Sequence, residues 1–203
     1  MGDELRGENL VHLNVRFSTE TELKKIQDFL YEKSGQGVSF TGLVEAMANE
    51  VTIVTAVHNI KSNKGSRTAG VDKIKMDKYL QMPKDELILL IQSCFRNYRP
   101  KPARREYIEK SNGKKRPLGI PTVLDRIIQE CVRIIIEPIC EARFYPQSYG
   151  FRPYRAQKHA IRGIINVINA GCKSPDQPVW AIEGDIKGCF DNINHRLLLQ
   201  KLW

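Results

Sequence analysis

The sequence predicts an α+β fold that is rich in helix and contains one basic β-hairpin. Three observations support this prediction. Several segments repeat apolar residues at helical spacing, two short runs flank an Asn-Gly turn, and the helices and the hairpin do not alternate strictly along the chain. An apolar fraction of 41% over 203 residues is enough for a folded core.

The first expected helix begins after Thr19, which can form a capping box with Glu22, and ends at Gly35. A second helix is expected from a cap at Thr41 to about Ile60, because valine, leucine and methionine recur there on one face. Both helices should bury an apolar side.

A loop is expected over residues 61–72, where Ser, Asn and Gly residues interrupt the apolar pattern. A third helix should run from Lys84 to Asn97, with acidic residues in its first turn. Two runs, Arg104–Glu109 and Lys115–Ile120, then flank Ser111-Asn112-Gly113. Asn-Gly between such runs is the strongest short-range signal for a hairpin.

A long apolar helix is expected to begin at Thr122, with Pro138 kinking or ending it. Another helix is expected over residues 156–170 with Gly171 at its end. A polar connection follows it.

The final strand is expected over Val179–Ile186, with a helix over His195–Trp203 after it. The strand would deliver Asp185 near its C-terminal end. Because Mg²⁺ takes carboxylate and phosphate oxygens, an acid in this place can hold the metal beside a nucleotide. Taken alone the pattern is weak, and without other motifs the interpretation of Asp185 and Asp191 as turn and capping residues is the favoured one.

The positive charge is concentrated in one part of the chain. Residues 1–60 hold five basic and nine acidic side chains, whereas residues 61–203 hold 27 and 14. Residues 96–116 alone carry nine basic side chains against Glu106 and Glu109. Such a cluster favours a polyanionic partner.

The five cysteines are odd in number and scattered, so they are interpreted as reduced core residues, and no zinc-binding spacing occurs. No apolar run approaches the roughly 18 residues of a membrane span, and the N-terminus lacks a secretory apolar stretch. A cytoplasmic location without a membrane partner is expected.

Four blocks of sequence carry a resemblance to a known family. They are Asn63-Lys64-Gly65-Ser66 with Gly70-Val71-Asp72; Gly113-Lys114-Lys115-Arg116-Pro117-Leu118-Gly119-Ile120-Pro121 with Asp125-Arg126; Phe144 with Ser148-Tyr149-Gly150-Phe151-Arg152-Pro153 and Arg155; and Asp185-Ile186-Lys187-Gly188-Cys189-Phe190-Asp191-Asn192-Ile193 with His195. In these blocks the chain resembles the reverse transcriptases encoded by group II introns, which also serve as splicing maturases.

The resemblance implies a reverse-transcriptase right-hand fold, of which this chain would hold the fingers subdomain and the first part of the palm. It divides the chain into an N-terminal extension with an RNA-contacting loop (1–72), fingers and the start of the palm (73–171), and a palm strand and helix (172–203). The implied activity is RNA-directed DNA polymerisation, with two Mg²⁺ ions, dNTP, an RNA template, a DNA primer and intron RNA as cofactors and partners.

The resemblance also assigns the polymerase site. Asp185 would be the catalytic acid and bind both metals, and the backbone carbonyl of Ile186 would bind one. Phe190 would lie under the sugar of the dNTP and reject a ribose 2′-hydroxyl, although a packed core phenylalanine is an equal alternative. Lys110 and Arg116 would reach the triphosphate.

Eight basic residues are implied to bind RNA, from the extension loop, the hairpin and the third block: Lys64, Arg67, Arg104, Arg105, Lys114, Lys115, Arg152 and Arg155. Tyr149 and Phe151 could stack on bases or could belong to the core. The third block departs from the family pattern at Tyr154, where glycine is usual, and at Ala156, where serine is usual.

The family supplies its other catalytic acids from a later Tyr-x-Asp-Asp hairpin, and no Asp-Asp pair occurs in these 203 residues. The chain is therefore expected to bind RNA but not to polymerise alone. Three alternatives stay open: a purely RNA-binding splicing factor, a protein-interaction module that forms a homodimer, and a related reverse transcriptase of the retron or diversity-generating type.

Overall fold

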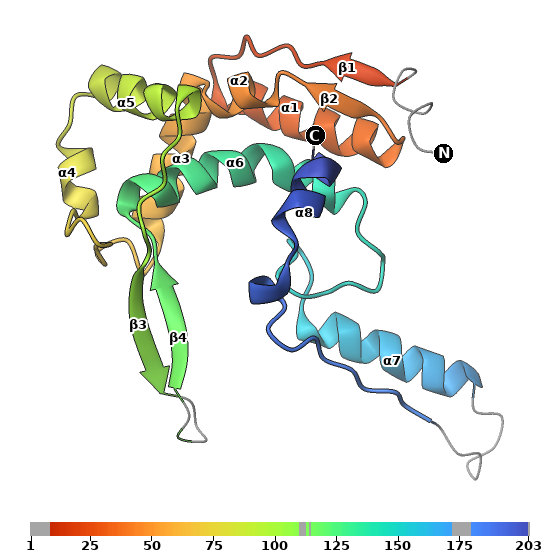
Figure 1. Cartoon of the computed structure of the whole chain (residues 1–203). Coiled ribbons are helices and arrows are strands. Elements are labelled where there is room, and N and C mark those ends of the chain that lie inside the picture. Colours follow the sequence, from red (N-terminus) through yellow and green to blue (C-terminus); the bar gives the residue numbers. More distant parts are fainter. Residues whose placement is uncertain (1–8, 110–112, 114, 172–179, 203) are drawn as a thin grey trace. The chain divides into compact units, whose positions relative to one another are not determined.

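The computed structural model describes residues 9–109, 113, 115–171 and 180–202 (Figure 1). The chain divides into two compact units, Met1–Tyr145 and Pro146–Trp203. The division falls inside the segment expected to form the fingers and the start of the palm, and the boundaries at residues 72 and 171 stay predictions. Among the described residues, no helix is both long and apolar enough to cross a membrane.

The first unit begins with a short parallel ladder around α1. Strand β1 (Leu10–His12) pairs with β2 (Ser39–Thr41), and α1 (Glu20–Gly35) lies between them in sequence. The capping box of α1 is confirmed: the amide of Glu22 donates to Oγ1 of Thr19 at 3.2 Å, and its carboxylate accepts from the Thr19 amide. The ladder was not predicted, because strands of three residues show no alternation.

The expected second helix is two helices, α2 (Leu43–Met47) and α3 (Glu50–Ser62). The prediction that Thr41 caps a helix is wrong, since Thr41 ends β2 and Gly42 precedes α2 with φ of 80°. Asn49 makes the break. Its Oδ1 accepts from the amide of Val51 at 2.8 Å, and its Nδ2 donates to the carbonyls of Val15 and Phe17 at 3.1 Å. A capping side chain thus starts a new helix.

After the loop, α4 (Met76–Leu80) was not predicted, whereas α5 (Lys84–Arg96) confirms the expected third helix. The hairpin is confirmed as well, with antiparallel strands β3 (Arg104–Glu109) and β4 (Lys115–Ile120). Its turn residues Ser111 and Asn112 lie outside the described residues.

Helix α6 (Val123–Glu141) is the centre of the first unit, and Thr122 caps it by accepting from the Asp125 amide at 3.1 Å. It packs on α1, α2 and α3. The apolar core gathers buried residues from these helices and from α5, among them Leu30, Ile53, Ile91, Ile127 and Ile135.

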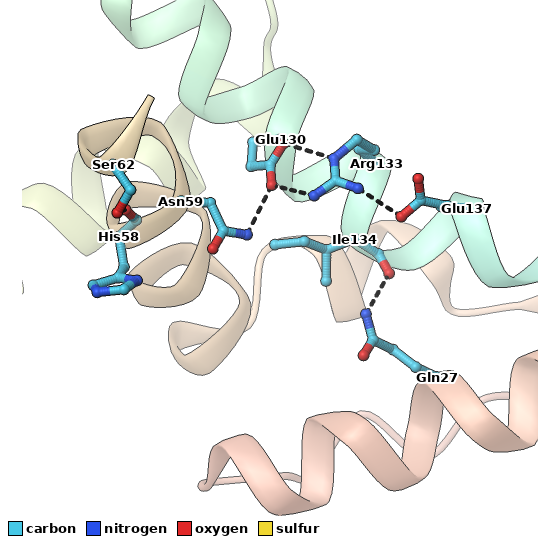
Figure 2. Close-up of polar contacts among 8 residues, drawn as sticks. All are labelled: Gln27, His58, Asn59, Ser62, Glu130, Arg133, Ile134 and Glu137. Atoms are coloured by element: carbon cyan, nitrogen blue, oxygen red, sulfur yellow. Dashed lines mark hydrogen bonds and ion pairs between the residues drawn. The ribbon is translucent and has the colours of Figure 1, made fainter. Parts of the chain in front are cut away.

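Helix α6 continues through Pro138 to Glu141, so the proline does not end it. Proline has no N–H, which leaves the carbonyl of Ile134 without its regular helical donor. Gln27 of α1 supplies a substitute, donating from Nε2 to that carbonyl at 3.0 Å (Figure 2). The same helix holds Arg133, which donates to Glu130 and Glu137, while Glu130 also accepts from Asn59 of α3 at 2.8 Å.

The second unit contains α7 (Gln157–Gly171), the short 3₁₀ helix η1 (Phe190–Asn192) and α8 (His195–Leu202). Two expected helices are thereby confirmed. The expected strand is not: residues 180–186 have no strand structure, and Val179 lies outside the described part of the chain. A strand requires a neighbour to pair its backbone groups, and the described residues of this unit offer none.

Candidate nucleic-acid interface

The loop between α3 and α4 is attached to the first turn of α6 by Arg126. Its Nη1 donates to the carbonyl of Gly65 at 2.8 Å, and its Nη2 donates to the carbonyl of Thr68. Burial lowers the pKa of this guanidinium, although Asp72 acts in the opposite direction. Lys64 and Arg67 of the same loop are exposed. The loop therefore exposes Lys64 and Arg67 to solvent, while Arg126 holds its backbone through two hydrogen bonds.

A close backbone contact fixes the end of this loop. A Cβ built on Gly70 would lie 2.7 Å from Cα of Thr122, so a side chain at position 70 would displace the start of α6. Asp72 follows and pairs with Lys101 at 3.4 Å. Since Thr122 lies two residues after β4, the loop is anchored at the base of the hairpin.

A buried carboxylate supports the same region. Asp125 accepts from the hydroxyl of Tyr98 at 2.9 Å and from that of Thr122 at 2.6 Å. Burial and the hydrogen bond to Asp125 raise the pKa of Tyr98 to about 12. The tyrosine thus remains a donor across the ordinary pH range.

The register of the hairpin sorts its side chains onto two faces, because directly opposed residues of an antiparallel pair lie on the same face. We call one the tyrosine face; it holds Arg105 opposite Gly119, Tyr107 opposite Pro117 and Glu109 opposite Lys115. We call the other the Arg116 face; it holds Arg104 opposite Ile120, Glu106 opposite Leu118 and Ile108 opposite Arg116.

The two faces carry the same formal charge but differ in pairing. Arg104 forms an ion pair with Glu106 at 3.1 Å. Within the described part of the chain, Arg105 and Lys115 have no ion-pair partner, and both are exposed. Lys110 and Lys114, the other predicted contacts of this hairpin, lie outside the described residues. Arg116 is exposed beside Ile108 and Leu118.

In the second unit, the third block is organised around Tyr149. Arg155 lies over its ring at 5.5 Å from the centroid and donates to the carbonyl of Pro146. Arg152 donates to the carbonyl of Ser148 at 2.9 Å. Both of the arginines predicted to bind RNA thus use some of their N–H donors for hydrogen bonds to carbonyls of their own loop.

Two aromatic side chains of this block project into solvent. Phe151 is fully exposed, which rules out the core alternative for it within this unit. Both Phe151 and Tyr154 have positive φ, 55° and 59°. The resemblance leads us to expect glycine at position 154, and glycine adopts this left-handed backbone more readily than tyrosine does.

Asp185 and Ile186 are exposed in the segment that leads into η1. Phe190 is 85% exposed, so the alternative of a packed core phenylalanine does not hold in this unit. No group of three potential metal-binding side chains occurs among the residues that were placed. Asp185 belongs to the second unit and Arg116 to the first, and their joint role in a polymerase site stays a prediction.

Two residues of the interface were missed from the sequence. Arg126 lies in a block that resembles the family, but its hydrogen bonds to a loop some sixty positions earlier have no local signal in the sequence. Tyr107 could have been found, because it lies two positions from Arg105 and alternation in a strand puts them on the same face.

Comparisons with known proteins bear on these features. Residues 108–203 match the family model described as reverse transcriptase (RNA-dependent DNA polymerase). Protein YkfC of Escherichia coli is 43% identical over 147 residues, which cover 68% of this chain and 36% of YkfC. Group II intron-encoded protein LtrA of Lactococcus lactis is 42% identical over 162 residues, covering 79% of this chain and 25% of LtrA.

A 91 kDa protein in the cob intron of Schizosaccharomyces pombe is 36% identical over 198 residues, covering 93% of this chain and 23% of that protein. The chain thus spans between about a quarter and about a third of the length of these curated relatives.

Proposed function

The chain belongs to the reverse transcriptases and maturases encoded by group II introns, and we propose that it forms the fingers and the first part of the palm of such an enzyme. In this proposal the fingers bind RNA, and the whole enzyme is an RNA-directed DNA polymerase that also assists intron splicing. The observation that carries this proposal is the β3–β4 hairpin, an exposed ribbon on which Arg105 and Lys115 have no ion pair with any described residue. Such a surface suits a phosphate backbone.

The loop with Lys64 and Arg67 extends this surface. Arg126 and Gly70 hold the loop at the base of the hairpin, so its two cations are positioned before RNA arrives. Pre-positioned side chains lose less conformational entropy on binding than free ones. We expect the loop and the hairpin to bind the same RNA strand together.

Nucleotide transfer would follow the two-metal pattern of the family. The primer 3′-hydroxyl attacks the α-phosphate of a dNTP, and pyrophosphate leaves. Asp185 and the carbonyl of Ile186 would hold Mg²⁺, which supplies charge neutralisation for this step. Their oxygens are the donors that Mg²⁺ prefers, but they fill only part of a six-coordinate shell.

The remaining site residues act on the nucleotide. Lys110 and Arg116 would donate to the triphosphate, and a guanidinium on a hairpin suits its bidentate oxygens. Phe190 would lie against the sugar, a role for which its exposed ring is free.

RNA binding by the 203-residue chain tests the proposal. We expect binding to single-stranded RNA without primer extension, since the chain has no Asp-Asp pair to complete a two-metal site. Extension of a primer by these residues alone would contradict the account, and so would the absence of RNA binding at low salt.

A longer protein that carries these residues separates polymerase from splicing factor. We expect Asp185→Ala to abolish DNA synthesis and to leave splicing assistance intact. If DNA synthesis is absent from the unsubstituted protein while splicing assistance is present, the alternative of a purely RNA-binding splicing factor holds.

The homodimer alternative rests on α7, whose isoleucines at helical spacing are exposed, among them Ile161, Ile164 and Ile168. An exposed apolar face of this kind can bind a second copy. Light scattering of the 203-residue chain decides the matter, because a monomer at high concentration removes this alternative.

A further inference from the structure

We propose that the two faces of the hairpin have separate partners, and that the tyrosine face binds single-stranded RNA while the Arg116 face is reserved for the incoming nucleotide. This inference rests on the proposed function and goes beyond it, because it divides the hairpin by face and thereby moves Arg104 out of the set of residues that the resemblance implies to bind RNA. It also assigns Tyr107 a role in base stacking.

Charge pairing is the first argument. Each face has two cations and one carboxylate, so the formal charge of the described residues is equal. On the Arg116 face, Glu106 already forms an ion pair with Arg104. On the tyrosine face, Arg105 and Lys115 have no ion pair among the placed residues, so both ends of this face are available to phosphate.

Side-chain shape is the second argument. Tyr107 is 58% exposed and lies on the same face as Arg105 and Lys115, with Pro117 opposite it. Gly119 opposite Arg105 adds no side chain to that end of the face, where a Cβ at position 119 would lie 3.4 Å from the Cβ of Ala103. A strand places Arg105 about 7 Å from Tyr107, so a base on the ring and a phosphate on the guanidinium can belong to neighbouring nucleotides.

The Arg116 face has a different character. Ile108 is opposite Arg116, and Leu118 is its neighbour on the same strand and face. An aliphatic floor with one guanidinium suits the flat base and the charged tail of one nucleotide better than a run of phosphates. The two chemistries therefore divide between the two sides of one ribbon.

Two double substitutions that remove equal charge from opposite faces form a matched test. One double variant combines Arg105→Gln and Lys115→Gln on the tyrosine face. The other combines Arg104→Gln and Arg116→Gln on the Arg116 face, and the two double variants are compared. Each pair is introduced into the 203-residue chain, and affinity for a mixed-sequence single-stranded RNA oligonucleotide is measured against salt without dNTP. Glutamine keeps most of the side-chain length, so local packing changes little.

The tyrosine-face pair should lower the magnitude of the log–log salt slope by roughly 1.4, since each single-strand phosphate contact contributes about 0.7. The Arg116-face pair should leave the slope unchanged, because Glu106 already pairs with Arg104; this result would remove Arg104 from the RNA contacts that the resemblance implies. Equal losses from the two pairs would overturn the assignment, as would a larger loss from the Arg116 pair.

Tyr107 gives a readout that does not depend on charge. Tyr107→Leu should weaken binding roughly tenfold, the effect of losing one stacked base, and Tyr107→Phe should bind like the unsubstituted chain. Equal affinities for Leu and Phe would refute the stacking role.

Failure of the inference can be told apart from failure of the proposed function. If the unsubstituted chain binds RNA and neither result above is obtained, the face assignment fails while the RNA-binding function stands. If the unsubstituted chain does not bind RNA at low salt, the proposed function fails and the face assignment fails with it.

Discussion

The guanidinium of Arg126 donates from Nη1 to the carbonyl oxygen of Gly65 at 2.8 Å, linking the first turn of α6 to a loop that lies far from it in sequence. A second bond from Nη2 reaches Thr68, so one side chain spans the loop. Two carbonyl acceptors held by one planar group form a bidentate contact that an ammonium cannot reproduce.

Arg126→Lys should therefore loosen the loop without changing charge. We expect faster amide exchange at Ser66 and Thr68, whose N–H groups bond within the loop, and RNA affinity about threefold to tenfold weaker because Lys64 and Arg67 are no longer held in place. Hydrogen exchange and RNA titration measure the two effects.

Arg133→Lys is the matched control, since Arg133 lies on the same helix but contacts Glu130 and Glu137 instead of the loop. It should leave loop exchange and RNA affinity unchanged. If the two lysine substitutions weaken RNA binding equally, the clamp has no specific role.

The proline in α6 gives a second prediction, independent of function. Gln27→Leu should lower the free energy of unfolding by about 1–2 kcal/mol, because the carbonyl of Ile134 loses its substitute donor. In a Pro138→Ala background the amide of residue 138 can again donate to the carbonyl of Ile134, so Gln27→Leu should lower the free energy of unfolding much less. Urea unfolding of the four proteins gives a double-mutant cycle, and additive effects would show that the two sites are not coupled.

A pH dependence is expected from Glu130. Burial would raise the pKa of its carboxyl, but hydrogen bonds from Arg133 and Asn59 outweigh it and hold the pKa below the ordinary value of 4.5. A group whose pKa is lowered on folding stabilises the protein above its unfolded pKa, and that contribution is lost as the pH falls through the folded pKa.

Glu130→Gln should therefore lower the free energy of unfolding by about 1–2 kcal/mol at neutral pH. This value allows for solvent screening of the ion pair, since the Arg133 side chain is half exposed. The loss should become progressively smaller below about pH 4.5. Glu45→Gln, at an exposed position of α2, is the control and should show no such difference. A Glu130→Gln cost that does not change between neutral and acidic pH would contradict the assignment. Urea unfolding at several pH values measures it.

The strained loop of the second unit gives a further prediction. Tyr154→Gly should stabilise this loop by about 0.5–1 kcal/mol, because glycine adopts φ of 59° without the usual penalty but has more freedom when unfolded. Tyr154→Ala removes the exposed ring and keeps the strain, so it should not stabilise. Amide exchange in α7 compares the two, and equal protection would exclude strain as the cause.

Local signals accounted for much of the fold. The Thr19–Glu22 capping box and the Asn-Gly hairpin act through neighbours in sequence, and both elements lie where they were predicted. Asn49 was missed because its effect depends on the distant carbonyls of Val15 and Phe17.

The interface was predictable to a smaller extent. The sequence indicated that the hairpin and the loop are basic, but the division of the hairpin into two faces depends on register, and the Arg126 clamp depends on a tertiary contact. The strand predicted around Asp185 failed for a related reason, since pairing partners and not the segment itself make a strand.

The central claim is that these residues grip RNA through the hairpin and its anchored loop, and a salt titration of the 203-residue chain with single-stranded RNA tests it most directly. About six phosphate contacts predict a log–log slope near −4, since each contributes about 0.7 on a single strand. Replacing Lys64, Arg67, Arg105 and Lys115 together should bring the slope near −1. Salt-independent binding, or a slope that survives this replacement, would contradict the claim.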